Sequence, residues 1–134
     1  MRTTQLTLLL VVFMSLLVFQ GCKKYEEGPL ISLQSKSKRL IGNWVSVIVF
    51  IDNTEWPGAG NGSIFYNFKD DGNYHRVFEF GRWEFDKSKE DLLMYPYHGE
   101  PYEMNILRLT RKELWLKNVV DGKEYEYHFE KDDK

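Results

Sequence analysis

The sequence predicts an all-β fold: an eight-stranded antiparallel up-and-down β-barrel preceded by a short N-terminal helical turn. Three observations support this prediction. From Trp44 onward, apolar residues recur with a period of two over short segments. Turn signals such as Asp121-Gly122 separate these segments at hairpin spacing. No long helical segment follows Trp44 that could connect parallel strands. A two-sheet β-sandwich is the alternative, because turn spacing does not distinguish the two architectures.

The elements can be placed one by one along the chain. Residues 31–41 carry spaced apolar side chains and end near Gly42, so one or two helical turns are expected there. Pro57 and several glycines make residues 52–62 the longest expected loop. Strands are expected at residues 44–51, 63–68, 74–80, 82–86, 92–97, 102–109, 113–119 and 123–130.

Two of these strands carry more specific expectations. In the first, simple alternation places Val45, Val47 and Val49 on one face and Trp44 on the other. The third is expected to end at Gly81, because an isolated glycine weakens the interior of a strand.

The N-terminus has the three-part layout of a secretory signal. A basic start at Arg2 is followed by apolar residues 6–19 and then by Gly21-Cys22. The apolar run is shorter than the ~20 residues that a membrane-spanning helix needs. We therefore expect residues 1–21 to be a removed leader, residues 22–30 a tether, and residues 31–134 the β-barrel domain.

Gly21-Cys22 also resembles the cleavage box of bacterial lipoproteins. The resemblance implies that the Cys22 thiol is acylated and that the chain is anchored to a membrane through this N-terminal lipid. It implies a place in the cell envelope, at the outer membrane, facing the periplasm or the surface. The alternative is a soluble secreted protein cleaved near Gly21, with its single cysteine unpaired.

Several stretches resemble the lipocalin-like domains of lipoproteins from Bacteroidetes-type bacteria. Gly42-Asn43-Trp44 is similar to the Gly-x-Trp start of lipocalins, and residues 81–85, 107–116 and 121–129 continue the likeness. The resemblance implies that Trp44 helps to close one end of the barrel. Lipocalins usually stack an Arg from the end of the last strand on this Trp. Residues 130–133 contain no Arg, and Lys131 would be a poor substitute, so the sequence does not support this closing contact.

Aromatic residues are the candidate ligand site. They could line a pocket for a small apolar or amphipathic ligand, or they could simply fill the barrel, because eight strands enclose little more than their own side chains. Trp56, in the longest loop, is a candidate lid or plug. The candidate ligand-binding residues are Trp44, Tyr74, Trp83, Phe85, Tyr95, Tyr97, Tyr125 and Tyr127.

Other chemistry has little support in the sequence. The net charge of −2 does not suggest nucleic-acid binding. His75, His98 and His128 lack the spacing of metal ligands, so no metal or other cofactor is predicted. No nucleophile motif is present, so no enzyme is predicted. The leading hypothesis is a lipid-anchored binding module. The alternative is a non-catalytic accessory subunit of a surface or periplasmic complex, with a filled barrel and a protein partner that the sequence does not identify.

Overall fold

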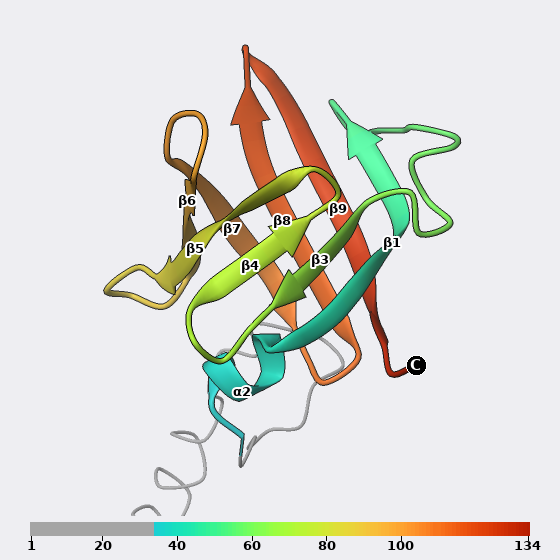
Figure 1. Cartoon of the computed structure of the whole chain (residues 1–134). Helices are drawn as coiled ribbons and strands as arrows, with labels where there is room; N and C mark the ends of the chain where they lie inside the picture. Colours follow the sequence, from blue (N-terminus) through green and yellow to red (C-terminus); the bar gives the residue numbers. More distant parts are fainter. Residues whose placement is uncertain (1–33) are drawn as a thin grey trace, which may run out of the picture. The chain divides into compact units, whose positions relative to one another are not determined.

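The structure, a computed structural model, describes residues 34–134 (Figure 1). The expected leader, the tether and Cys22 lie outside the described residues. Within residues 34–134, no helix is long and apolar enough to cross a membrane. The elements are α2 (Lys36–Leu40), β1 (Gly42–Ile51), β2 (Thr54–Glu55), β3 (Phe65–Phe68), β4 (Asn73–Arg76), β5 (Glu79–Phe85), β6 (Asp91–Pro96), β7 (Tyr102–Leu109), β8 (Glu113–Val120) and β9 (Lys123–Asp132).

The strands form one closed antiparallel barrel. Their order is β2-β1-β3-β4-β5-β6-β7-β8-β9, and β9 pairs back to β1. Eight strands make the ring, while the two-residue β2 pairs only with the end of β1. Closure leaves no free edge in the ring. The predicted up-and-down barrel is therefore confirmed, and the sandwich alternative is wrong.

The predicted break at Gly81 is wrong. The chain turns at Val77-Phe78 instead, and Gly81 lies inside β5, paired with Tyr74 and Pro96. A Cβ atom on Gly81 would lie 2.3 Å from the Tyr95 carbonyl oxygen and 2.8 Å from the Tyr74 ring. Glycine is needed here because a neighbouring strand and a ring approach closely, and not because the chain turns.

The expected alternation along the first strand is also wrong. A β-bulge shifts the register of β1 against β9 between Ser46 and Ile48. Trp44 and Ser46 are buried on one side of the bulge, and Val49 is buried beyond it. Because a bulge inserts an extra residue, the inward face changes parity, so Val45 and Val47 do not share the face of Val49.

The core lies inside the barrel, and we call the end of the barrel at α2 the base. Tyr66 stacks on Phe68 with ring centroids 5.2 Å apart, and Phe129 meets Tyr66 edge-on at 5.6 Å. The Trp83 ring contacts Phe68 at 5.8 Å. Buried aliphatic side chains complete this packing: Leu40, Leu92, Met94, Met104, Ile106, Leu109, Leu114 and Leu116.

The closing contact that the sequence does not support is present in the structure, because Lys131 contacts Trp44. Its Nζ lies 4.9 Å from the centroid of the Trp44 ring. The same ammonium donates hydrogen bonds to the carbonyls of Arg39 (3.1 Å) and Ile41 (2.7 Å), at the end of α2. Trp44 Nε1 donates to the Leu40 carbonyl at 2.7 Å. A cation on the last strand thus joins the helix and the tryptophan and closes the base.

Candidate ligand site at the barrel mouth

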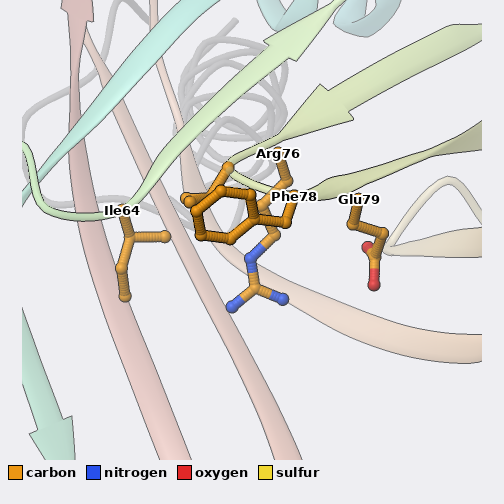
Figure 2. A pocket seen from close by; sticks show the side chains of 5 residues that line it. Ile64, Arg76, Phe78 and Glu79 are labelled. Carbon is orange, nitrogen blue, oxygen red and sulfur yellow. The ribbon is translucent and has the colours of Figure 1, made fainter.

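A pocket of about 370 Å³ lies at the end of the barrel opposite α2, which we call the mouth. Figure 2 shows that its side chains come from the β4–β5 hairpin and from the residue before β3. The strand pattern explains the arrangement, because Tyr74 and Arg76 alternate inward along β4. The lining residues are Ile64, Arg76, Val77, Phe78 and Glu79.

The turn that carries the pocket is strained. Arg76 pairs with Glu79, so Val77 and Phe78 form a two-residue hairpin loop. Val77 has φ of 25°, a conformation that is unfavourable for a β-branched residue. Phe78 is 95% exposed at the tip. The turn brings Glu79 back to the inner face directly opposite Arg76.

Tyrosine hydroxyls surround the inner side of Glu79. Its Oε1 accepts hydrogen bonds from Tyr74 at 2.6 Å and from Tyr102 at 2.7 Å. Burial raises the pKa of both hydroxyls, and the hydrogen bonds to the Glu79 carboxylate raise each pKa further. Burial also raises the pKa of Tyr66, whose hydroxyl lies 3.6 Å from Met104 Sδ. At neutral pH these groups are therefore uncharged donors.

The guanidinium of Arg76 has no ion-pair partner within residues 34–134. It lies 5.3 Å from the centroid of the Tyr66 ring. In Figure 2 it lies between the side chains of Ile64 and Glu79, beneath Phe78. A half-buried guanidinium that lines a pocket and forms no ion pair can bind an acidic group of a ligand.

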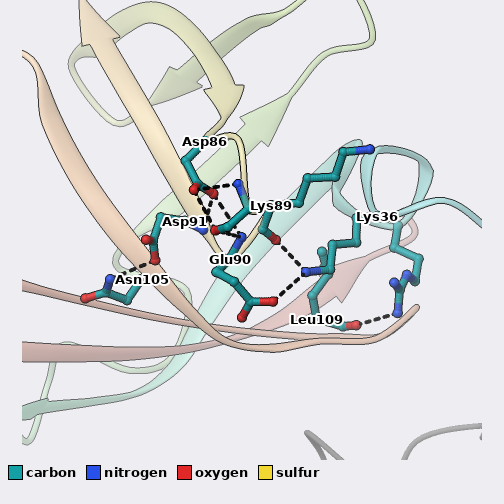
Figure 3. Close-up of polar contacts among 9 residues, drawn as sticks. Lys36, Asp86, Lys89, Glu90, Asp91, Asn105 and Leu109 are labelled. Atoms are coloured by element: carbon teal, nitrogen blue, oxygen red, sulfur yellow. Dashed lines mark hydrogen bonds and ion pairs between the residues drawn. The ribbon is translucent and has the colours of Figure 1, made fainter.

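The base differs from the mouth because α2 is tied to its neighbours there (Figure 3). Lys36 Nζ donates to the Lys89 carbonyl and pairs with the Glu90 carboxylate at 3.5 Å. Arg39 donates to the Leu109 carbonyl at 3.0 Å. These contacts hold the helix against the β5–β6 loop and the end of β7. The mouth is therefore the open end.

The Asp86 carboxylate organises the β5–β6 loop that receives Lys36 (Figure 3). It accepts hydrogen bonds from the backbone amides of Ser88 (2.8 Å), Glu90 (2.9 Å) and Asp91 (3.0 Å). A hydrogen bond from the Ser88 hydroxyl, followed by those from backbone amides, lowers the pKa of Asp86. The charged carboxylate thereby fixes the loop conformation onto which α2 docks.

None of the eight aromatic candidates lines the mouth pocket. Trp44, Tyr74 and Tyr127 are buried in the core. The partly buried candidates Trp83, Phe85 and Tyr125 pack against that core. These six candidates therefore pack within or against the core of the described residues.

Tyr95 and Tyr97 do not join the interior. They are 39% and 65% exposed, because Leu92 and Met94 occupy the inward positions of β6. Tyr95 donates to Glu84 at 2.8 Å on the outer wall, where these two residues line a groove of about 290 Å³ with Arg82 and Trp83. Tyr97 lines a second groove, also of about 290 Å³, which adjoins the mouth pocket through Phe78 and Glu79.

The loop candidate Trp56 is 51% exposed, so it does not plug the barrel. The buried residue of this loop is Ala59, whose carbonyl accepts hydrogen bonds from Ser46 at 2.8 Å and Ser63 at 2.6 Å. A lid role for Trp56 stays a prediction.

The histidines do not converge. In the part of the chain that the structure describes, no three His, Cys, Asp or Glu side chains gather as a metal site. His75 stacks on Phe80 with centroids 4.2 Å apart, and His128 stacks on Trp115 at 4.0 Å. His98 lines the groove beside Tyr97.

Sequence reasoning did not find Arg76 or Glu79. Arg76 carried a usable signal, because it lies two residues from the inward Tyr74, and a charged residue on an inner face is uncommon. Glu79 carried none. Continued alternation from Tyr74 would have placed Phe78 inward and Glu79 outward, and the turn at Val77-Phe78 reverses this.

Comparison with solved structures bears on the fold. A lipocalin-like protein from Bacteroides uniformis aligns with a TM-score of 0.52 at 17% identity, covering 70% of this chain and 99% of that one. The fold is lipocalin-like. No protein-family model and no curated protein matches the sequence. In this lipocalin-like barrel the mouth pocket is lined by Arg76 and Glu79 together with three apolar side chains.

Proposed function

We propose that this chain is a lipid-anchored binding protein of the cell envelope, and that it holds a small amphipathic ligand by its acidic head group at the barrel mouth. The observation that carries the proposal is the Arg76 guanidinium, which faces a pocket of about 370 Å³ without a carboxylate partner. This volume falls within the ~300–1,000 Å³ typical of small-molecule sites. The proposed role is binding and not catalysis.

The chemistry of the pocket supports an acidic head group. An incoming carboxylate can pair with Arg76, and Ile64, Val77 and Phe78 offer apolar contact to the rest of the ligand. Glu79 opposes an anion only in part, because its Oε1 already accepts hydrogen bonds from two tyrosines. The packed interior below the pocket supports a ligand that rests at the mouth.

Calorimetric titration tests this binding. The mature chain with Cys22→Ser would be titrated with decanoate, decanol and decyltrimethylammonium. We expect decanoate to bind most tightly of the three. Arg76→Gln should weaken the affinity for decanoate about 10- to 100-fold, because a charge-assisted hydrogen bond is lost. Glu79→Gln should strengthen decanoate binding by removing a like charge.

Arg82→Gln is the matched control, because Arg82 is an exposed arginine on the outer wall of β5. It should leave the affinity unchanged. Equal binding of decanol and decanoate, or an Arg76→Gln variant that binds like the parent, would refute acidic head-group recognition.

The membrane anchor is the second part of the proposal. Its support is the leader-like pattern of residues 1–21 and the Gly21-Cys22 pair. We expect Cys22→Ala to abolish metabolic labelling by a radioactive fatty acid and to release the protein from the membrane fraction. Arg76→Gln is the control variant, which should still incorporate the fatty acid and stay in the membrane fraction. Label that persists in Cys22→Ala would rule out this anchor.

A specific observation also favours the accessory-subunit alternative. The rings of Tyr66, Phe68 and Phe129 fill the interior, as expected for a barrel that serves only as a scaffold. The titration separates the two functions, because a scaffold would bind none of the three probes. Purification of the tagged protein from its own membrane, with a stoichiometric protein partner retained, would then support the accessory role.

A further inference from the structure

The exposed large apolar side chains of the described residues gather at the mouth. Three of the four connections there carry one, the end of β8 beside the fourth carries two, and two more, Phe80 and Tyr95, lie on the outer wall. Those at the mouth are Trp56 (51% exposed), Phe78 (95%), Tyr97 (65%), Val119 (65%) and Val120 (46%). We call these five residues the rim.

The base lacks such residues. Its connections are residues 69–72, 86–90 and 110–112, and α2 covers it; in none of these described segments is a large apolar side chain exposed. Charged residues dominate there instead. Figure 1 shows the two ends, with α2 at the bottom and the β8–β9 hairpin projecting furthest at the top. The domain is therefore amphipathic from end to end.

We propose that the rim docks on an uncharged or zwitterionic lipid surface, so that the mouth opens onto a bilayer. This goes beyond the proposed function and rests on it in one respect, because a docked mouth would take an amphipathic ligand from the lipid phase. Tryptophan and tyrosine favour the membrane–water interface, where an apolar ring and a polar edge are both satisfied.

The spacing of the rim favours lipid over a protein partner. Its apolar groups lie on four separate tips, and acidic residues interrupt them at Asp52, Glu55, Glu100 and Asp121. The centre of a protein interface is depleted in charge, whereas separate tips can enter a fluid interface independently. The same acidic residues would be repelled by anionic lipid, which selects a neutral surface.

The length of chain between Cys22 and the described residues fits this arrangement. Residues 23–33 separate Cys22 from the first described residue, Gln34, and an extended chain over this span reaches at most about 43 Å. The longest strands have ten residues, or about 33 Å. A chain anchored through Cys22 therefore has enough length for the mouth to meet the membrane that holds its lipid.

Vesicle co-sedimentation tests the docking. The mature chain with Cys22→Ser, free of ligand, would be mixed with phosphatidylcholine vesicles and with vesicles containing phosphatidylglycerol. We expect partition to the former, weakened by the anionic lipid. Replacing Val119 and Val120 together by serine should lower partition about tenfold, because two apolar side chains are lost from one tip. Trp56→Ser provides a second rim variant.

Tyr95→Ser is the matched control, because it removes an exposed aromatic ring from the outer wall and not from the rim. It should change partition by less than about twofold. The proposal is overturned if the parent does not partition to the vesicles or if the rim variants partition like the parent. It is also overturned if Tyr95→Ser lowers partition as much as the rim variants do. A dimer in sedimentation velocity that the rim variants abolish would assign the rim to a second copy instead.

Decanoate titration without vesicles separates this inference from the proposed function. The Val119→Ser, Val120→Ser variant should bind decanoate like the parent, since neither valine lines the pocket. Normal decanoate binding with no vesicle partition would overturn the docking alone. Normal partition with no decanoate binding would overturn the proposed ligand alone.

Discussion

A single lysine performs at the base a task that lipocalins usually assign to arginine. The ammonium of Lys131 contacts the Trp44 ring and two carbonyls at the end of α2. Burial lowers the pKa of Lys131, while the nearby charge of Asp133 raises it. Two directed hydrogen bonds to carbonyls suit a compact ammonium, which explains how lysine serves where a planar guanidinium is usual.

Lys131→Ala should therefore destabilise the barrel by about 1–3 kcal/mol, because two partly buried carbonyls lose their donor and Trp44 loses its cation. Urea unfolding followed by tryptophan fluorescence measures the change. Lys131→Arg should retain most of the stability, and Lys123→Ala, at an exposed hairpin position, should match the parent. A Lys131→Ala variant as stable as the parent would show that the base closes without this contact.

At the scale of elements, strands with strict alternation could be predicted from the sequence and their irregularities could not. Apolar and polar residues alternate along residues 123–130, and β9 spans all of them. The bulges in β1 and β7 have no residue-type signal, since the residues they insert are ordinary strand formers. The turn at Val77-Phe78 lacks the Asn, Asp or Gly that two-residue turns favour. Gly81 is a residue type that is common in turns, but it lies inside a strand.

The candidate site follows from those irregular positions. The aromatic pattern predicts the core well, because rings at inward positions fill a barrel of this size. It does not predict the pocket, which depends on which two residues turn the β4–β5 hairpin. One displaced turn decides whether Glu79 faces the interior with Arg76 or the solvent.

At the scale of the whole molecule, the buried tyrosines link stability to alkaline pH. Burial raises the pKa of Tyr66, Tyr74, Tyr102 and Tyr127 above the ordinary value of 10.0. The native state therefore keeps protons that the unfolded chain releases. Their contribution to the unfolding free energy is complete below pH 10 and is lost progressively as pH rises above it.

We expect these tyrosines to ionise only as the barrel unfolds. Tyrosinate absorbance and circular dichroism, recorded together during alkaline titration, should show a late absorbance step that coincides with loss of the β signal. Tyr102→Phe should reduce the fall in stability above pH 10, because one shifted group is removed. Complete ionisation with the β signal intact would contradict this linkage.

The pairing of β1 with β9 gives the barrel a particular order of assembly. This seam joins the first ring strand to the last, along residues 43–51 and 125–132. Each intermediate strand can find its sequence neighbour early, but the ring stays open until the final residues arrive. A nascent or exported chain that lacks only its end would therefore present two bare edges, and a short C-terminal truncation would cost more than its length suggests.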